Sequence, residues 1–231
     1  MPIAFDTAVD GSLVNPGTSL TWSHTHTGNN LLSLVSVFGD TQGGDADGSK
    51  ITGVTNNSVS MTELARVLPS GDRWLYLFYL LAPATGAHNI VVSASSSIVI
   101  AGQSASYTGV KQSGFPDNST TNTANTALDI TTSLATSANN CWTFLATKNS
   151  IGASAADTGS TLRISNANGM GIYDSNALIT PAGSYSMKVN IGSLANWAAI
   201  MASFAPADTG PDLTHVSPQQ YFRGMGSPMQ N

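Results

Sequence analysis

The chain is poor in the residues that usually supply charge, helix and covalent cross-links. Of its 231 residues only 9% are charged, and a single cysteine, Cys141, is present. One cysteine excludes an internal disulfide framework and every zinc motif built on paired cysteines. With one glutamate, Glu63, and few lysines or arginines, the chain also offers little material for helices. Its stability must come from packing and from backbone pairing between strands.

Basic side chains and long apolar runs are scarce as well. Lysine and arginine together number 8 and the net charge is −5, so no basic stripe can neutralise a phosphate backbone. No apolar run approaches the ~18 residues that a membrane helix needs, and residues 1–6 lack the basic and apolar parts of a signal peptide. We therefore expect no nucleic-acid partner, no membrane partner and no export through a cleaved signal.

Small polar side chains are abundant instead. Serine, threonine and asparagine number 30, 25 and 18, about a third of the chain, while hydrophobic residues make up 41%. The hydrophobic share is sufficient for a core, which argues against a disordered chain. The composition predicts a folded protein whose surface is covered by hydroxyl and amide groups.

Residues 19–26 alternate between polar and larger side chains with a period of two, which is typical of a strand. One face of this strand would carry Leu20, Trp22, His24 and His26. The following Gly28-Asn29-Asn30 tolerates positive φ angles, and residues 31–38 are almost entirely apolar. We predict that 19–26 and 31–38 pair as a hairpin.

The same pattern continues to the end of the apolar part of the chain. It predicts further short strands over residues 50–54, 61–68, 73–81, 88–94, 98–107, 127–132, 141–148, 161–165, 170–178, 183–190 and 195–204. Turn clusters such as 43–48 separate them at the spacing of a β-sandwich or barrel. Residues 111–126 have few large apolar side chains and are expected to form a long surface excursion. The prediction is one all-β domain over residues 1–205, an antiparallel two-sheet β-sandwich.

The C-terminal segment has a different texture. Residues 206–231 contain four prolines and no alternating run, so the segment cannot build a core of its own. We predict an extended arm that docks on a neighbouring subunit, and a frayed terminus is the alternative. The predicted contact residues are Tyr221, Phe222, Arg223, Met225 and Met229.

A resemblance to a known group rests on residues 73–93, RWLYLFYLLAPATGAHNIVVS, and on ASYTGV at 105–110. An aromatic strand that runs into Ala-Pro-x-Thr-Gly, followed by a Ser-Tyr-x-Gly-Val strand end, resembles jelly-roll-like β-sandwich structural proteins of tailed bacteriophages. Related sandwich domains occur in extracellular, sometimes carbohydrate-associated, bacterial proteins. The resemblance covers about residues 19–205 and implies a jelly-roll-like fold with no catalytic residues to transfer. The strands on either side of Pro83 and Gly86 are expected to pair as a hairpin.

Few residues stand out as chemical sites. His24 and His26 share one strand face and could offer two imidazoles to a metal, but no third ligand is apparent, so half-buried or rim histidines are favoured. No Gly-x-Ser-x-Gly motif indicates a serine hydrolase. Asp45 and Asp47 resemble the start of a calcium loop, but Asn56 stands where an EF-hand has its closing glutamate, so a solvated turn is favoured.

The large apolar side chains are expected to pack in the core. Each tryptophan lies in an apolar strand, which favours packing over a sugar-stacking platform; the four are Trp22, Trp74, Trp142 and Trp197. Cys141, which precedes a tryptophan, is expected to be a buried small hydrophobe. The acids lie mostly in turns, which disfavours a glycosidase carboxylate pair.

Two functions remain. The first is a non-enzymatic structural protein of a tailed-phage virion, either a head decoration or a tail-associated subunit. It would be assembled in the host cytoplasm and would contact copies of itself and other virion proteins. The alternative is a glycan-binding or adhesive surface module, which the same sandwich and its loops would suit. Neither function requires a cofactor or a metal.

Overall fold

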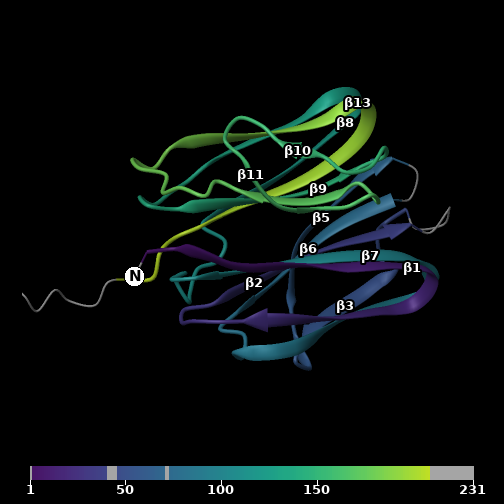
Figure 1. The fold of residues 1–231 in the computed structure, drawn as a ribbon, viewed down its shortest axis with the longest axis horizontal. Helices are drawn as coiled ribbons and strands as arrows, with labels where there is room; N and C mark the ends of the chain where they lie inside the picture. The colour runs from purple at the N-terminus through teal and green to yellow at the C-terminus, as the bar shows by residue number, and fades with distance from the viewer. Residues whose placement is uncertain (1, 41–45, 71–72, 209–231) are drawn as a thin grey trace, which may run out of the picture.

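The computed structural model describes residues 2–40, 46–70 and 73–208. In that part of the chain thirteen strands form two antiparallel sheets that pack face to face (Figure 1). The first sheet contains β1 (Ala4–His26), β2 (Leu32–Asp40), β3 (Ile51–Asn56), β4 (Val59–Ser60), β5 (Thr62–Ser70), β6 (Arg73–Leu81) and β7 (Gly86–Thr108). The second contains β8 (Asn118–Ala135), β9 (Trp142–Asn149), β10 (Ala155–Ala156), β11 (Thr161–Ser165), β12 (Met170–Asp174) and β13 (Ser184–Phe204). The fold is the predicted all-β, two-sheet sandwich.

The first sheet is organised around β7. Strand β1 follows one edge of β7 along its whole length, from Ala4 opposite Thr108 to His26 opposite Gly86. The other edge of β7 is shared by β2, which pairs with residues 99–107, and by β3, which pairs with residues 90–94. Strands β6 and β5 continue the sheet beyond β2. The long strand β7 therefore belongs to two parts of the sheet: one end pairs with β2, which leads to β6 and β5, and the other end pairs with β3.

The second sheet repeats this arrangement around β13. Strand β8 follows one edge of β13, while β9 and β10 share the other edge. Strands β12 and β11 continue the sheet beyond β9, as β6 and β5 continue the first sheet beyond β2. The chain thus contains two halves with the same strand order, a duplication that the sequence patterns above did not predict.

Two predicted hairpins are wrong. The segment Gly28–Asn30 does reverse the chain, with φ of 85° at Gly28 and 51° at Asn30, but β1 and β2 then pair with opposite edges of β7. Strands β6 and β7 flank Pro83 and Gly86, and β2 lies between them. The reason is that β2 is buried along nearly its whole length, so it needs a neighbour on each edge.

The predicted strand boundaries also need correction. Residues 118–126 belong to β8 and not to a surface excursion, because an edge strand can form its ladder with polar side chains that face water. Residues 88–94 and 98–107 lie in the single strand β7, and 183–190 and 195–204 lie in β13. Glycines, bulges and serines interrupt the apolar pattern of these strands without ending them.

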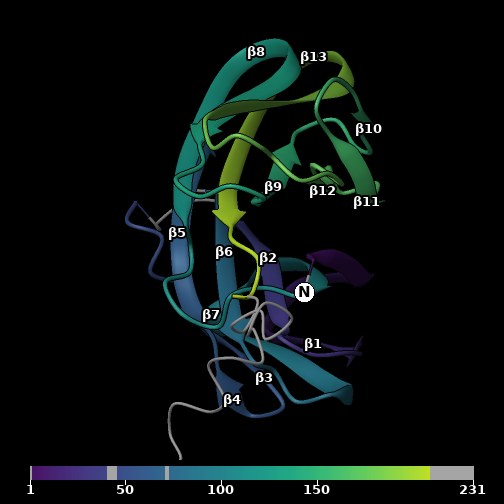
Figure 2. The ribbon, with the colours of Figure 1, turned by 90° about the vertical axis from the view of Figure 1, so that its left-hand side faces the viewer.

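Each long strand pair bends back over its own sheet. In the first half the ring of Trp22 lies so close to two glycines that a Cβ atom would be 2.5 Å from it at Gly11 and 2.6 Å at Gly102. In the second half β8 and β13 arch over the top of the molecule (Figure 2). The bends create apolar layers beneath each arch in addition to the layer between the sheets. The glycines are needed because any larger side chain would displace the tryptophan.

The core contains most of the predicted apolar residues. Tyr107 lies at the centre of the layer between the sheets, with its ring centroid 5.0 Å from that of Phe204. Trp22, Trp142 and Trp197 are buried and Cys141 is fully buried, as predicted. Trp74 is only half-buried at the margin of its cluster. Three of the four tryptophans are therefore confirmed as core residues.

Candidate functional site

Polar side chains of the two halves form hydrogen-bonded clusters at the ends of strands. In the first half Asp6, on β1, accepts hydrogen bonds from the hydroxyl and the main-chain N–H of Thr27, the latter at 3.0 Å. The hydroxyl of Ser106, on β7, donates to Asp6 Oδ2 at 2.7 Å. Burial raises the pKa of Asp6, but these hydrogen bonds outweigh it and hold the pKa below its ordinary value. The carboxylate acts as a clamp that holds both ends of β1 beside β7.

The second half contains the same clamp. Asp117 accepts from the hydroxyl and the main-chain N–H of Ser137, the latter at 2.9 Å, and the Ser203 hydroxyl donates to Asp117 Oδ2 at 2.9 Å. Hydrogen bonds again outweigh burial and lower the pKa of this carboxyl. Because these three residues occupy the positions of Asp6, Thr27 and Ser106 in the shared strand order, the clamp is a duplicated feature.

A chain of hydrogen bonds leads from the first clamp into the core. Trp22 Nε1 donates to Ser104 Oγ at 2.9 Å, and Ser104 Oγ lies 2.8 Å from His24 Nδ1. On the other side of the ring His24 Nε2 lies 3.0 Å from Ser106 Oγ, which donates to Asp6. The Ser106 hydroxyl donates to Asp6, so its oxygen can only accept from His24 Nε2. The Ser104 oxygen accepts from Trp22, which leaves its proton for His24 Nδ1. The proton of the neutral imidazole is therefore assigned to Nε2.

His26 lies beside His24 in the same layer, with ring centroids 4.5 Å apart. The side-chain amide of Asn56 donates to His26 Nε2 at 3.2 Å and approaches Ser33 Oγ at 3.3 Å. Both histidines are essentially inaccessible to solvent. Burial, together with the neighbouring His26 in the case of His24, lowers the pKa of each histidine to about 4. Both imidazoles are therefore neutral near pH 7.

These contacts correct the expectation that the two histidines are half-buried or at a rim, because bending of the β1 and β7 ribbon places them under the arch. Serine, histidine and aspartate do meet here, but Ser106 stands between His24 and Asp6, whereas a hydrolase needs the histidine in the middle. Among the described residues no group of three metal-ligating side chains comes together. The arrangement suits a structural network that fixes the arch.

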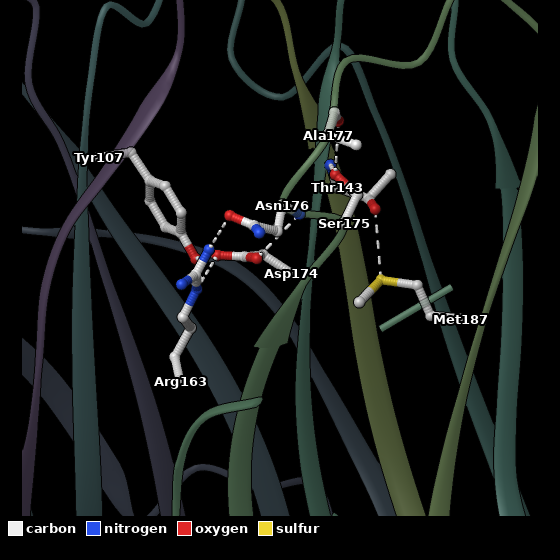
Figure 3. A network of polar contacts seen from close by, with 8 residues as sticks. All are labelled: Tyr107, Thr143, Arg163, Asp174, Ser175, Asn176, Ala177 and Met187. Carbon is white, nitrogen blue, oxygen red and sulfur yellow. Dashed lines mark hydrogen bonds and ion pairs between the residues drawn. The ribbon is translucent and has the colours of Figure 1, made fainter. Parts of the chain in front are cut away.

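A second buried network joins the two halves (Figure 3). Asp174, at the end of β12, has no solvent-exposed surface. Arg163 on β11 donates through Nε to Asp174 Oδ2 at 2.6 Å, and the Tyr107 hydroxyl from the first half donates to the same oxygen at 3.0 Å. Arg163 also donates through Nη2 to Asn176 Oδ1 at 2.6 Å and lies 4.1 Å from the centre of the Phe5 ring. The ion pair thus ties β11 and β12 to β1 and β7.

The environment of Asp174 determines its ionisation. Burial raises its pKa, and the hydrogen bonds and charge of Arg163 counteract only part of that effect. Burial and the neighbouring Asp174 carboxylate likewise raise the pKa of Tyr107 well above its ordinary value. The next residue, Ser175, continues the network by accepting from the main-chain N–H of Thr143 at 3.2 Å. The network around Asp174 is therefore a set of buried hydrogen bonds and one ion pair that holds neighbouring strands together.

The predicted calcium-like turn is held by protein groups. The Asp47 carboxylate accepts from the main-chain N–H of Ser49 at 3.2 Å, as in an ordinary Asx turn. The main-chain oxygen of Gly48 accepts from Arg66 and, at 3.0 Å, from the Tyr76 hydroxyl. Asp45 lies outside the described residues. The described part of the turn points its main-chain oxygen inward to a guanidinium and a phenol.

The predicted contact residues of the arm, Tyr221, Phe222, Arg223, Met225 and Met229, all lie outside the described residues. The beginning of the predicted arm does pair with the body: Ala207 N donates to the Gly109 oxygen at 2.7 Å, and Lys111 N donates to the Ala205 oxygen at 2.9 Å. Where the structure describes the chain, it contains no helix long and apolar enough to cross a membrane.

Comparison with known proteins does not assign the chain to a family. The chain matches no protein-family model, and its sequence matches no curated protein. The sequence does contain two short repeats that match between the halves. Asn29-Asn30 and Asn139-Asn140 precede β2 and β9. Ala-Ser-Tyr at 105–107 lies near the end of β7, and Ala-Ser-Phe at 202–204 ends β13. Two short similarities at matching positions would have indicated the duplication and, through it, the pair of carboxylate clamps.

Proposed function

We propose that the chain is a non-enzymatic structural subunit of a tailed-phage virion that acts through contacts with other copies and with other virion proteins. The observation that carries this proposal is the outer edge of β8. Among the described strands β8 pairs only with β13, and its residues 118–126 contain neither a charge nor a proline. Soluble proteins usually protect such an edge with charges or prolines. Strand β5 of the first sheet lies close to β8 but does not pair with it, so the unpaired edge suits strand addition from a neighbouring subunit.

The rest of the molecule suits the role of a rigid building block. The half-buried Asp6 and Asp117 carboxylates and the buried Asp174 carboxylate hold strands together, and the last of these joins the two halves. Two side-chain amides at the edge, Asn118 and Asn122, bond to main-chain oxygens of Ala135 and Thr131 across the bend of β8. The bend is thereby fixed, which presents residues 118–126 as a preformed strand. The resemblance to virion sandwich proteins supplies the kind of particle.

The test places charge on the edge. Thr121 and Thr123 are exposed, and we expect Thr121→Lys with Thr123→Lys to abolish self-association of the full chain in sedimentation velocity without changing its melting temperature. The matched control is Ser186→Lys, an exposed position on the inner strand β13, which should assemble normally. Unchanged assembly of the double variant would reject the edge as the contact.

Glycan binding remains a second candidate because of one surface feature. A groove of about 310 Å³ on the second arch is lined by Leu128, Asp129, Lys188, Asn190 and Gly192. The Asp129 carboxylate can accept hydrogen bonds from sugar hydroxyls, the Lys188 ammonium can donate to them, and the Asn190 amide can do both, while one face of the sugar packs on the exposed Leu128. Saturable binding of an oligosaccharide on a glycan array, lost in Asp129→Asn, would favour this function over assembly.

A further inference from the structure

A small cleft opens where the ends of β2 and β9 face each other across the two sheets. Phe38 and Pro69 form its apolar wall, and Lys148, Arg73 and Asn196 contribute polar groups. Phe38 and Lys148 occupy matching positions in the two halves, since Phe38 pairs with Ala101 of β7 and Lys148 pairs with Ala198 of β13. The duplication therefore places an aromatic ring and an ammonium group opposite each other.

Lys148 is held in this cleft by contacts that do not neutralise it. Its Nζ lies 4.6 Å from the centre of the Phe38 ring, a cation–π contact, and it donates to the main-chain oxygen of Asn149. None of the ion pairs among the described residues includes Lys148. A partly buried ammonium whose partners are a ring and a carbonyl retains donor capacity toward the cleft.

The neighbouring charges add a second cation. Arg73 lies at the rim with about half of its side chain exposed, and its guanidinium is paired with the Asp40 carboxylate at 3.0 Å. The local sum of Lys148, Arg73 and Asp40 is therefore positive. Burial, and then the charge of Arg73, lowers the pKa of Lys148 to about 8, and Asp40 counteracts only part of this. A partly desolvated ammonium that is not paired with a carboxylate is unfavourable, and it is stabilised when an anion reaches it.

We propose that this cleft binds a carboxylate, with the Lys148 ammonium as the principal contact and Arg73 as a second cation at the rim. A carboxylate fits better than a bulkier oxyanion because the enclosed space is about that of one water molecule, which is enough for a carboxylate oxygen. The rest of the ligand would lie at the open mouth, beside Phe38 and Pro69. The carboxylate could belong to a free small acid or to an Asp or Glu side chain of a second copy. The proposal does not depend on the edge of β8.

The direct test is an NMR titration of the full chain with labelled lysine side chains, using acetate at constant ionic strength against chloride. Acetate bound only to the ammonium form raises the Lys148 pKa, by about one unit at ten times its Kd. Lys148→Met should abolish saturable acetate binding, and Arg73→Gln should weaken it several-fold. Lys111, which is exposed near Asp208, is the matched control; its signal should not move, and Lys111→Met should leave acetate binding intact.

Sedimentation velocity of the same samples identifies the source of the carboxylate. If acetate dissociates an assembly and Lys148→Met prevents its formation, the natural ligand is a carboxylate of a neighbouring copy. If acetate binds without changing sedimentation, the ligand is a free small acid. A Lys148 signal that does not respond to acetate, or that responds equally to chloride, would overturn the proposal, as would unchanged acetate binding by Lys148→Met.

Discussion

The two halves of the molecule share their frame and differ in what fills it. Both contain an aspartate that receives three hydrogen bonds at the ends of its long strand pair, Asp6 in the first half and Asp117 in the second. Under the first arch, however, His24 lies opposite His88, whereas under the second Leu134 lies opposite Tyr185. A hydrogen-bonded carboxylate fixes the strands, and the layer beneath can then be either polar or apolar.

In the layer between the sheets, matching positions of the two halves also hold different kinds of side chain. Arg163 sits in an irregularity of β11 between Leu162 and Ile164, and Leu64 sits in the matching irregularity of β5. Asp174 pairs with β9 at the position where Tyr79 pairs with β2. The second half therefore has a buried ion pair at this place. The first half has apolar contacts at the matching place, including Tyr79, whose ring centroid lies 4.5 Å from that of Phe115. Matching strand positions can therefore hold an ion pair in one half and apolar side chains in the other, because the Asp174 charge is paired with Arg163.

The largest expected effect comes from breaking the ion pair. Asp174→Ala leaves the Arg163 guanidinium and the Tyr107 hydroxyl without their acceptor, and we expect a loss of about 3–5 kcal/mol in the free energy of unfolding, measured in urea. The matched change in the other half, Tyr79→Phe, should cost less than about 1 kcal/mol. Combining Arg163→Met, Asp174→Leu and Tyr107→Phe, which removes both charges and the buried hydroxyl, should recover most of the loss. Equal costs for Asp174→Ala and Tyr79→Phe would contradict the expected difference between the two halves.

The histidine pair should make the first arch sensitive to acid. Because the folded-state pKa values of His24 and His26 are about 4, below the ordinary 6.5, the unfolded state binds more protons. Stability is therefore complete above pH 6.5 and falls as the pH drops toward 4, by up to about 3 kcal/mol for each histidine. Asp6 and His88 face the pair and modify this loss.

A variant that copies the second half sharpens this prediction. Leu134 and Thr136 stand where the first half has His24 and His26, so His24→Leu with His26→Thr should flatten the unfolding free energy between pH 6.5 and 4. The hydroxyls left behind still have partners, since Ser104 accepts from Trp22 and Ser106 donates to Asp6. An unchanged pH slope in urea denaturation would show that other groups cause the acid sensitivity.

The two clamps should be equal in strength. Asp6→Ala and Asp117→Ala each remove three hydrogen bonds to a charged acceptor, and we expect about 2–3 kcal/mol for each in urea denaturation. The difference between them should be below about 1 kcal/mol, because each carboxylate accepts from one main-chain N–H and two hydroxyls, and the further contact of Asp117 with the Cys141 thiol is a weak one. If one substitution were silent and the other severe, the clamps would not be equivalent.

The smallest effect on stability is expected from the C-terminus. A chain that ends after Asp208 keeps the pairing of residues 205–207 with 109–111, so its urea midpoint should be unchanged. If the predicted contacts of Tyr221, Phe222, Arg223, Met225 and Met229 are real, this chain should bind particles or copies of itself more weakly. Undiminished assembly would show that the segment is only a terminus.

The sequence was sufficient for the fold class but not for the topology. Alternation at residues 19–26 and 127–132 predicted strands because a half-buried strand has a period of two. It could not reveal that β2 inserts between β6 and β7, since its apolar residues say only that it is buried and not which strands flank it. The buried histidines were missed because a bend at glycines such as Gly11 and Gly102 closes the arch over them, and distant glycines give no local pattern.

Assembly through the edge of β8 is tested most directly by hydrogen–deuterium exchange of the full chain below and above the concentration at which it self-associates. Within residues 118–126 we expect the main-chain amides that point away from β13 to exchange at least about tenfold more slowly in the assembled state, because they would pair with a second chain. The amides that already pair with β13, and those of the buried β2, should stay unchanged. Assembled particles in which residues 118–126 exchange as fast as in the free chain would contradict the proposed contact.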